Sequence, residues 1–304
     1  MKALVTGGSG FIGRNILITC REEGWDTVSL DLIESDYGDV NIMGSVLDQT
    51  ILKQAFKDVD VVFHEAAVTS PPQFEAFPSE GFNVNSQGTF NVLEEASEAG
   101  VSKVILASSS ALYGNSKQIS RENQVDLDFK NVYPMTKYFN EMTAKFFSEN
   151  TSLQTVCLRY FNAYGVGENS KGFYSSPIDK FIKSIQRGER PVIFGDGTQS
   201  RDFIYVKDIA KANIKAAENG KSGESYNVGT GVTTSFNDIY KLIRNAFDSD
   251  LEPIYSPVPY KSYQLFTQAD MTKATHELKF KPEYDLRKGI NEIAEYAETR
   301  KINE

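Results

Sequence analysis

The chain has 304 residues, of which 40% are hydrophobic and 24% charged, and its formal net charge is −9. This is the composition of an ordinary globular protein, long enough for one large α/β domain or two closely joined ones. An acidic chain without a Lys/Arg-rich run argues against nucleic acid and anionic membranes as partners. Any phosphate group that it binds must therefore be held by local geometry and not by bulk charge.

Cysteine and histidine are too sparse for a disulfide framework or a histidine metal site. The only cysteines are Cys20 and Cys157, and the only histidines are His64 and His276. This usage suits a reducing compartment, so we expect a cytoplasmic protein without a bound metal. The apolar N-terminal stretch is broken by glycines and by Arg14, which argues against a signal peptide, and no run approaches the roughly 18 apolar residues of a membrane helix.

A glycine-rich turn follows the first predicted strand, which is the apolar run ALVT at 3–6. The turn reads GGSGFIG, with Gly7, Gly10 and Gly13, and a helical pattern begins within it. This is the dinucleotide-binding spacing in the strand–turn–helix context that it requires. We expect Gly7 to permit the tight turn, Gly10 to let a pyrophosphate approach the backbone, and Gly13 to allow close packing of the helix on the strand.

Asp31 follows the second predicted strand, TVSL at 27–30. A carboxylate at this distance from the glycine turn accepts hydrogen bonds from the adenosine ribose hydroxyls and repels a 2′-phosphate. No Lys or Arg occurs from Asp31 to Val40 to reverse that preference. The sequence therefore predicts NAD, and not NADP, as the cofactor.

Short apolar runs continue to alternate with helical patterns as far as residue 160. Further strands are predicted at 59–64, 103–108 and 154–160, and helices at 11–24, 45–56, 80–100 and near 131–149. Near-continuous apolar strands separated by helices indicate a parallel sheet that is covered on both faces. With right-handed crossovers, this predicts an α/β fold with a doubly wound parallel sheet of the Rossmann type.

The predicted strand at 103–108 runs into three serines, Ser108 to Ser110, at its carboxyl end. Serine runs are usually loop filler, but this run ends a buried strand and faces the expected cleft. We expect one of these hydroxyls to hydrogen-bond the reacting oxygen of a substrate.

Tyr133 and Lys137 are four positions apart in NVYPMTKYFNE, residues 131–141, and so lie one turn apart on the same side of a helix. A phenol with an unperturbed pKa of roughly 10 is a poor base at neutral pH. We expect Lys137 and the positive nicotinamide ring to lower that pKa, so that Tyr133 takes a proton from a sugar hydroxyl while the adjoining carbon gives hydride to NAD. Pro134 is compatible if the helix starts near Asn131, because the proline then lies in the first turn.

After residue 165 the alternation of strands and helices loosens. Polar loops, isolated prolines and the glycines of FGDGTQSRDF suggest a smaller, irregular lobe. We predict an NAD-binding Rossmann domain at 1–165 and a substrate-binding α/β lobe at 166–304, some segments of which return to the first domain. The cleft between them would lie at the carboxyl ends of the strands.

Together these motifs resemble the extended short-chain dehydrogenases/reductases, and more narrowly the nucleotide-sugar epimerases and dehydratases. The match covers almost the whole chain. The matching segments are GGSGFIG, Asp31, FHEAA (63–67), SSSALYG (108–114), the Tyr133–Lys137 pair, RYFNAYG (159–165), FGDGTQSRDFIYVKDIA (194–210) and YNVGTG (226–231).

The resemblance implies a role for each matching residue. The implied catalytic residues are Ser109, Tyr133 as acid/base and Lys137 as its partner. The implied cofactor-binding residues are Gly7, Gly10, Phe11, Ile12, Gly13, Asp31, Ser45, Val46, Ala66, Ala67, Asn85, Ser108, Tyr133, Lys137 and Tyr160. The implied substrate-binding residues are Ser109, Ser110, Asn162, Lys171, Arg201 and Tyr263.

Two of these substrate residues, Asn162 and Arg201, match positions that hold the diphosphate of a sugar nucleotide. Arg201 can fork two phosphate oxygens, which would compensate locally for the acidic composition. A surface ion pair is the alternative interpretation of this arginine.

The sequence departs from the family pattern at three places. The 4,6-dehydratases carry an Asp–Glu pair directly after the catalytic Thr, and here Ser110 and Ala111 stand there, so we do not expect dehydration. The Asp-plus-aliphatic pair that usually meets adenine is Ser45–Val46. An arginine common in the C-terminal lobe is missing from 260–274, where Lys261 is the nearest cation.

Two segments, 168–176 and 260–274, resemble the ADP-glycero-manno-heptose 6-epimerases. In that group, lysine and tyrosine residues that correspond to Lys171 and Tyr263 serve as a second base and a sugar contact. Lys171 is equally interpreted as a solvated surface lysine.

We therefore expect an NAD-dependent epimerase of a nucleotide-diphosphate sugar, acting at C4 of a UDP-hexose of the glucose/galactose type through a transient keto sugar. The alternatives are an ADP-heptose 6-epimerase-like enzyme and a simple NAD-dependent dehydrogenase of the same family. The predicted helices at 82–99 and 131–149 carry apolar residues on more than one side, and by resemblance they would pair in a homodimer. Core packing within one chain explains the same pattern.

Overall fold

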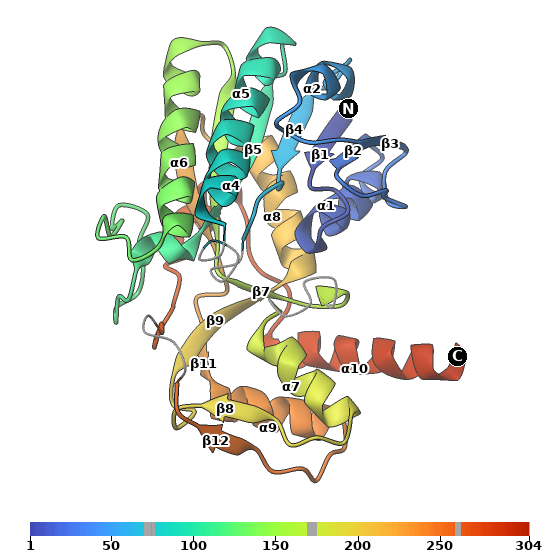
Figure 1. Ribbon diagram of the computed structural model, residues 1–304, viewed down its shortest axis with the longest axis vertical. Helices are drawn as coiled ribbons and strands as arrows, with labels where there is room; N and C mark the ends of the chain where they lie inside the picture. The colour runs from blue at the N-terminus through green and yellow to red at the C-terminus, as the bar shows by residue number, and fades with distance from the viewer. Residues whose placement is uncertain (70–73, 75–76, 169–174, 259–262, 304) are drawn as a thin grey trace.

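The protein is described here by a computed structural model that covers residues 1–69, 74, 77–168, 175–258 and 263–303. Its main feature is a sheet of seven parallel strands in the order β10-β6-β5-β4-β1-β2-β3 (Figure 1). The strands are β1 (Lys2–Thr6), β2 (Asp26–Asp31), β3 (Val40–Met43), β4 (Val61–His64), β5 (Lys103–Ser109), β6 (Gln154–Tyr160) and β10 (Glu224–Val228). This order confirms the predicted doubly wound α/β fold.

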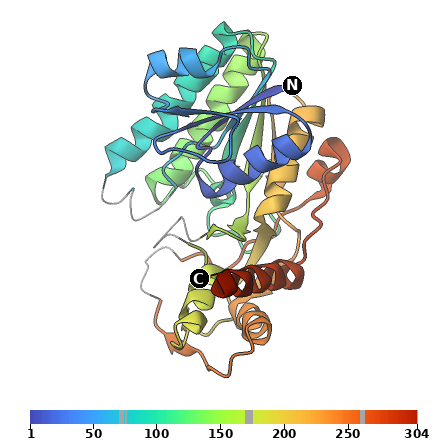
Figure 2. The same cartoon turned by 90° about the vertical axis from the view of Figure 1, so that its right-hand side faces the viewer.

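Helices cover both faces of this sheet, as Figure 2 shows with the sheet seen edge-on. On one side lie α1 (Phe11–Glu22) and α8 (Val206–Asn219), and on the other α2 (Gln49–Ala55), α5 (Gly88–Glu98) and α6 (Val132–Asn150). Neighbouring strand residues point to opposite sides, so that Phe63 enters the first core and Val62 the second. Two buried faces explain why the strands are apolar throughout.

The sequence located five of the seven strands, but β3 and β10 were missed. Three of the four residues of β3 are exposed, so it lacks the apolar run that marked the others. The strand β10 follows a long helix and reads ESYNV, which is not an apolar run. The predicted helix at 80–100 is in fact α4 (Pro78–Phe82), the π-helical turn η1 (Asn83–Gln87) and α5.

The remaining elements form a smaller lobe below the main sheet in Figure 1. One small sheet joins β7 (Asn162–Tyr164), β9 (Ser200–Tyr205) and β11 (Thr233–Ser235), and a second joins β8 (Val192–Phe194) and β12 (Ile254–Ser256). Around them lie α7 (Pro177–Gln186), α9 (Phe236–Ala246) and α10 (Leu286–Asn303), with an aromatic-rich core. Although α8 and β10 follow residue 165, they pack on the main sheet, and a domain boundary at that residue stays a prediction.

Within the described residues, no helix is long and apolar enough to cross a membrane, and no group of three or more His, Cys, Asp or Glu side chains could hold a metal ion. Both cysteines are free and buried, Cys20 in one core and Cys157 in the other. Burial raises the pKa of the Cys20 thiol to about 12, with a smaller contribution from the charge of Glu23, so this thiol is unreactive.

Candidate functional site

The glycine-rich turn has no room for a side chain at Gly7 or Gly13. Gly7 has φ 72° and its N–H donates to Leu30 O at 2.8 Å, while a Cβ on it would lie 2.8 Å from Ala66 N. A Cβ on Gly13 would collide with the carbonyl oxygen of Gly7. The helix α1 begins after Gly10, which supplies no side-chain cap, so the first N–H groups of the helix are available to an anion.

Asp31, the last residue of β2, lies directly beside this turn. Its Oδ2 accepts the Ser9 N–H at 3.0 Å and its Oδ1 accepts the Ile33 N–H at 3.3 Å. The carboxylate is therefore held at the edge of the phosphate cradle, where a ribose would follow the pyrophosphate. A direct bond from Asp31 to the ribose stays a prediction.

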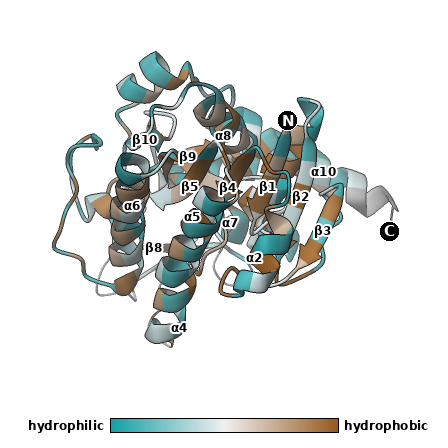
Figure 3. Ribbon diagram, turned by 90° about the horizontal axis from the view of Figure 1, so that it is seen from above, coloured by the Kyte–Doolittle hydropathy of each residue, from teal (hydrophilic) through white to brown (hydrophobic). Residues whose placement is uncertain are grey.

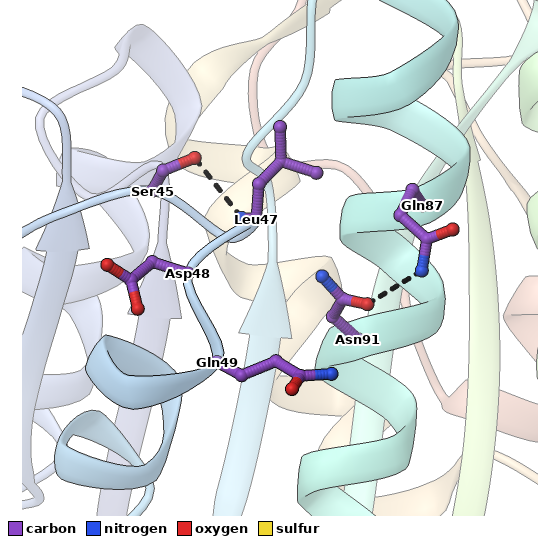
Figure 4. Close-up of a pocket in the computed structure, with 6 residues that line it drawn as sticks. All are labelled: Ser45, Leu47, Asp48, Gln49, Gln87 and Asn91. Carbon is purple, nitrogen blue, oxygen red and sulfur yellow. Dashed lines mark hydrogen bonds between the residues drawn. The ribbon is translucent and has the colours of Figure 1, made fainter.

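A polar hollow of about 600 Å³ opens between the start of α2 and the η1–α5 helix (Figure 4). Ser45 Oγ accepts the Leu47 N–H at 3.1 Å, and Gln87 Nε2 donates to Asn91 Oδ1 at 2.8 Å across the opposite wall. Val46 is 5% exposed and packs in the core beneath. Of the predicted adenine pair, Ser45 lines the hollow, whereas Val46 is a core residue.

The segment after β4 is fixed by buried polar groups. The His64 ring is hydrogen-bonded on both sides, with Nδ1 2.7 Å from Thr6 Oγ1 and Nε2 2.9 Å from Thr89 Oγ1. Burial lowers the pKa of His64 to about 3, so the ring is neutral. Ala66 and Ala67, which follow shortly after β4, are partly exposed beside the glycine-rich turn, where a cofactor would contact them.

Asn85 was predicted to lie beside the nicotinamide, but its amide is engaged within the chain. It accepts the Val68 N–H at 2.8 Å and donates to Val68 O at 2.9 Å and Thr136 Oγ1 at 3.1 Å. Asn85 is fully buried. Its side chain therefore ties the segment after β4 to α6, and its place near the nicotinamide stays a prediction.

The helix α6 presents Tyr133 and Lys137 at the carboxyl end of β5. The helix starts where Asn131 Oδ1 accepts the Tyr133 N–H at 3.1 Å, and Pro134 lies in the first turn as predicted. Lys137 Nζ lies 5.9 Å from the centre of the Tyr133 ring and donates to Ala107 O at 2.8 Å. The two side chains are thus neighbours, with the ammonium fixed to the end of the strand.

The surroundings of Tyr133 and Lys137 shift both pKa values. Burial raises the pKa of Tyr133, the Ser109 hydrogen bond opposes the rise, and the charge of Glu65 adds to it. The expected lowering of this pKa by Lys137 together with the nicotinamide ring stays a prediction. Burial lowers the pKa of Lys137 itself to about 8, against the charge of Glu65.

The three serines after β5 have different surroundings. Ser109 accepts the Ala111 N–H at 3.1 Å and hydrogen-bonds Tyr133, and Ser110 begins the short helix η2 (Ser110–Tyr113). Ser108 is buried and donates to Glu141 Oε1 at 2.6 Å. The Ser108 hydroxyl is therefore engaged within the protein, and a contact of this residue with the cofactor stays a prediction.

The smaller lobe contributes Asn162 and Arg201. Asn162 Nδ2 donates to Asp202 O and Thr267 Oγ1, both at 2.9 Å. Arg201 is 6% exposed, and its guanidinium lies 5.6 Å from the ring centres of both Phe236 and Tyr263.

Arg201 donates to Ser200 O at 3.0 Å, but no described carboxylate pairs with it. Burial lowers the pKa of Arg201 to about 10, a shift that Tyr263 opposes. Because a buried charge without a partner is costly, a guanidinium in this position is suited to binding an anionic ligand.

The remaining predicted residues are placed as follows. Tyr160, at the end of β6, donates to Glu65 Oε1 at 2.7 Å. Phe11 and Ile12 pack at the start of α1, Phe11 with 4% exposure. Lys171 lies outside the described residues. Sequence reasoning assigned no role to Glu65 or Asp202, although both lie within motifs that it quoted.

A glycine-rich phosphate cradle between a strand and a helix, and a Ser–Tyr–Lys set at the end of a central strand, define a Rossmann-fold enzyme of the short-chain dehydrogenase/reductase class. The family model for the NAD dependent epimerase/dehydratase family matches residues 3–229. The chain belongs to this family. Membership confirms the predicted resemblance, NAD as the cofactor and enzymatic activity.

Several relatives and solved structures that the chain resembles are named as sugar-nucleotide epimerases. A Methanocaldococcus jannaschii protein named "Putative UDP-glucose 4-epimerase" is 33% identical, over 96% of this chain and 97% of that protein. The structure of UDP-glucose 4-epimerase from Thermotoga maritima, with UDP-glucose, gives a TM-score of 0.92 at 31% identity and covers 100% of both chains.

UDP-N-acetylglucosamine 4-epimerase from Methanobrevibacter ruminantium, in complex with UDP-N-acetylmuramic acid, gives a TM-score of 0.91 at 31% identity over 98% of each chain.

Replacing Gly13 by alanine is expected to weaken NADH binding at least tenfold, because the added methyl group must displace Gly7 and with it the phosphate cradle. NADH fluorescence titration measures the effect. Gly24→Ala is the matched control at the other end of α1. Gly24 has φ 74°, so alanine strains the backbone there, but no atom lies within 4 Å of its Cβ. Unchanged NADH affinity in Gly13→Ala would contradict the assigned cradle.

Proposed function

We propose that the protein interconverts UDP-hexoses of the glucose/galactose type by inverting the configuration at C4. The observation that carries the nucleotide-sugar part of this proposal is Arg201, a buried guanidinium that no described carboxylate neutralises. The names of the similar proteins support UDP as the nucleotide and C4 as the position, but they differ in the sugar.

A diphosphate fits this arginine physically. A buried charge without a partner is costly, whereas a guanidinium can bind two phosphate oxygens in parallel. The rings of Phe236 and Tyr263, each centred 5.6 Å from the guanidinium, restrict its position. Asn162 lies on the neighbouring strand β7, opposite Phe203 in the β7–β9 register, and would support the same ligand.

The chemistry at C4 follows from the residues at the end of β5. Lys137 stabilises Tyr133 as a phenolate, which takes the proton of the C4 hydroxyl, while Ser109 hydrogen-bonds the same oxygen. NAD, when bound, would supply a reversible acceptor for the C4 hydride. After the keto sugar has rotated, Tyr133 gives the proton back on the other side, so that one acid/base residue serves both directions.

A panel of sugar nucleotides tests this function. Wild-type protein with UDP-, GDP- and ADP-sugars is expected to interconvert the C4 epimers of a UDP-hexose, as resolved by NMR. Tyr133→Phe should lower turnover by at least three orders of magnitude with little change in NADH affinity, because it removes the proton carrier alone. Conversion at C6 of an ADP-heptose, or net NADH release, would instead support one of the two alternatives.

The role of Arg201 is tested by Arg201→Met, which preserves apolar stacking and removes the charge. We expect the KM for the UDP-sugar to rise about 100-fold, since a charge-assisted bidentate contact is worth roughly 3 kcal/mol. NADH affinity should not change. Arg190→Met is the control, because Arg190 is exposed in the same lobe and donates only to the carbonyls of residues 252 and 253. An equal effect of both replacements would refute the diphosphate site.

We further propose that the enzyme is a homodimer that pairs through α6. Met135, Phe139, Met142 and Phe146 follow one another at three- and four-residue intervals along this helix, with 41%, 44%, 52% and 58% exposure. Phe82 of α4 extends the row, at 6.3 Å from the Phe139 ring. Such an exposed apolar row is typical of a helix–helix interface between subunits.

Introducing charge into this row should separate the subunits. The double variant Phe139→Glu/Phe146→Glu is expected to elute and scatter as a monomer of about 34 kDa in size-exclusion chromatography with light scattering, where the wild type is a dimer. Val192→Glu, which charges a 43% exposed residue in the smaller lobe, should leave the dimer intact. A monomeric wild type would refute the proposal.

A further inference from the structure

Glu65 lies at the carboxyl ends of the three strands that carry the proposed chemistry. It directly follows β4, and its N–H donates to Thr6 O at 3.1 Å. In the sheet, His64 pairs with Leu106 of β5, and Ser109 of β5 pairs with Tyr160 of β6. Tyr160 donates its hydroxyl to Glu65 Oε1 at 2.7 Å, so the carboxyl group is fixed against the end of β6.

The Glu65 carboxylate has hydrogen-bonding support but no ion pair. Asn213 of α8 donates to Tyr160 Oη at 2.8 Å and to Ile209 O at 2.9 Å, and this holds the tyrosine in place. No Lys or Arg of the described residues forms a salt bridge with Glu65. Lys137 is the cation that interacts with it at longer range.

The charge of Glu65 shifts the pKa of Lys137, and the charge of Lys137 shifts the pKa of Glu65. Burial raises the pKa of Glu65 to about 7, while the Tyr160 hydrogen bond and the Lys137 charge oppose the rise. Burial lowers the pKa of Lys137 to about 8, and the Glu65 charge opposes that fall. The same charge raises the pKa of Tyr133.

We propose that Glu65 is a positioning residue whose carboxylate, anchored by Tyr160, keeps Lys137 charged and thereby sets the pH range in which Tyr133 and Lys137 work together. The inference rests on the proposed function, because it assigns those two residues to catalysis. Glu65 acts through its charge and needs no contact with the substrate.

Other titratable groups also face this cluster, and each is accounted for. His64 is neutral, Cys157 is a buried thiol whose pKa burial raises, and Glu141 is already paired with Arg159. The Tyr160 hydroxyl stays protonated because burial raises its pKa well above the ordinary value. Glu65 is therefore the group whose charge changes near neutral pH beside Lys137.

The sign of the effect can be worked out. An ionised Glu65 stabilises the Lys137 ammonium, so neutralising it lowers the pKa of Lys137 and moves the alkaline limb of the pH–rate profile to lower pH. On the acid side, the Glu65 carboxyl has already taken up a proton below about pH 7, and its replacement changes little there. The alkaline limb should therefore move by about one pH unit and the acid limb by less.

The test compares pH profiles of kcat/KM for wild type and Glu65→Gln, which keeps the size of the side chain and can still accept the Tyr160 hydrogen bond. Glu65→Leu is a second neutral variant and should give the same shift of the alkaline limb. Asn213→Leu is the matched control, because it disturbs the same hydrogen-bonded cluster but leaves the carboxylate in place. The pH profile of kcat/KM for Asn213→Leu is expected to keep its acid and alkaline limbs at the wild-type pH values.

NADH affinity as a function of pH gives a readout that needs no sugar nucleotide. The alkaline loss of affinity, which reports deprotonation of Lys137, should move to lower pH by the same amount in Glu65→Gln. If the wild type binds NADH but converts no sugar, the proposed function fails while this titration still tests Glu65. Superimposable titrations of wild type and Glu65→Gln, or an equal shift in Asn213→Leu, would overturn the inference.

Discussion

The buried ion pair between Glu141 and Arg159 determines where α6 lies on the sheet, and the proposed active site depends on it. Arg159 of β6 donates through Nε at 2.8 Å and Nη2 at 2.7 Å to the two carboxylate oxygens of Glu141, and both side chains are under 10% exposed. Tyr133, Lys137 and Glu141 recur at four-residue intervals and share one face of α6. Fixing Glu141 against the sheet therefore fixes the other two at the strand ends. Breaking such a pair costs roughly 3–5 kcal/mol, because it leaves an uncompensated buried charge.

The same arginine connects parts of the chain that are distant in sequence. Arg159 Nη1 donates to Tyr113 Oη at 2.9 Å and to Glu122 O at 2.7 Å. Tyr113 in turn donates to Asn227 Oδ1 at 2.5 Å, which brings β10 into the network. The loop after β5 is thus held between α6 and the last strand of the sheet. Because Ser109 precedes that loop, its position relative to Tyr133 depends on contacts that span more than 100 residues.

The sequence predicted the features that local patterns encode. Strands buried on both faces appear as apolar runs, and a glycine turn between strand and helix needs no distant partner to be identified. What it missed depends on tertiary contacts. The direction of the Ser108 hydroxyl is set by Glu141, and that of the Asn85 amide by Val68 and Thr136. Likewise, the sequence does not show the burial that raises the pKa of Tyr133 and lowers that of Lys137. The catalytic and binding roles of these residues stay predictions.

Arg201 forms no ion pair with a described carboxylate because the carboxylate next to it in the chain is satisfied by other groups. Asp202 is fully buried next to Arg201 in the chain, and it would be the natural partner of the guanidinium. It accepts instead the N–H groups of Thr230, Gly231 and Ala269, at 2.8, 2.9 and 3.0 Å. Backbone amides can satisfy a carboxylate as a cation does, without supplying a charge that would compete with Arg201. Two loops of the smaller lobe therefore converge on Asp202, and this arrangement leaves the positive charge of Arg201 unpaired.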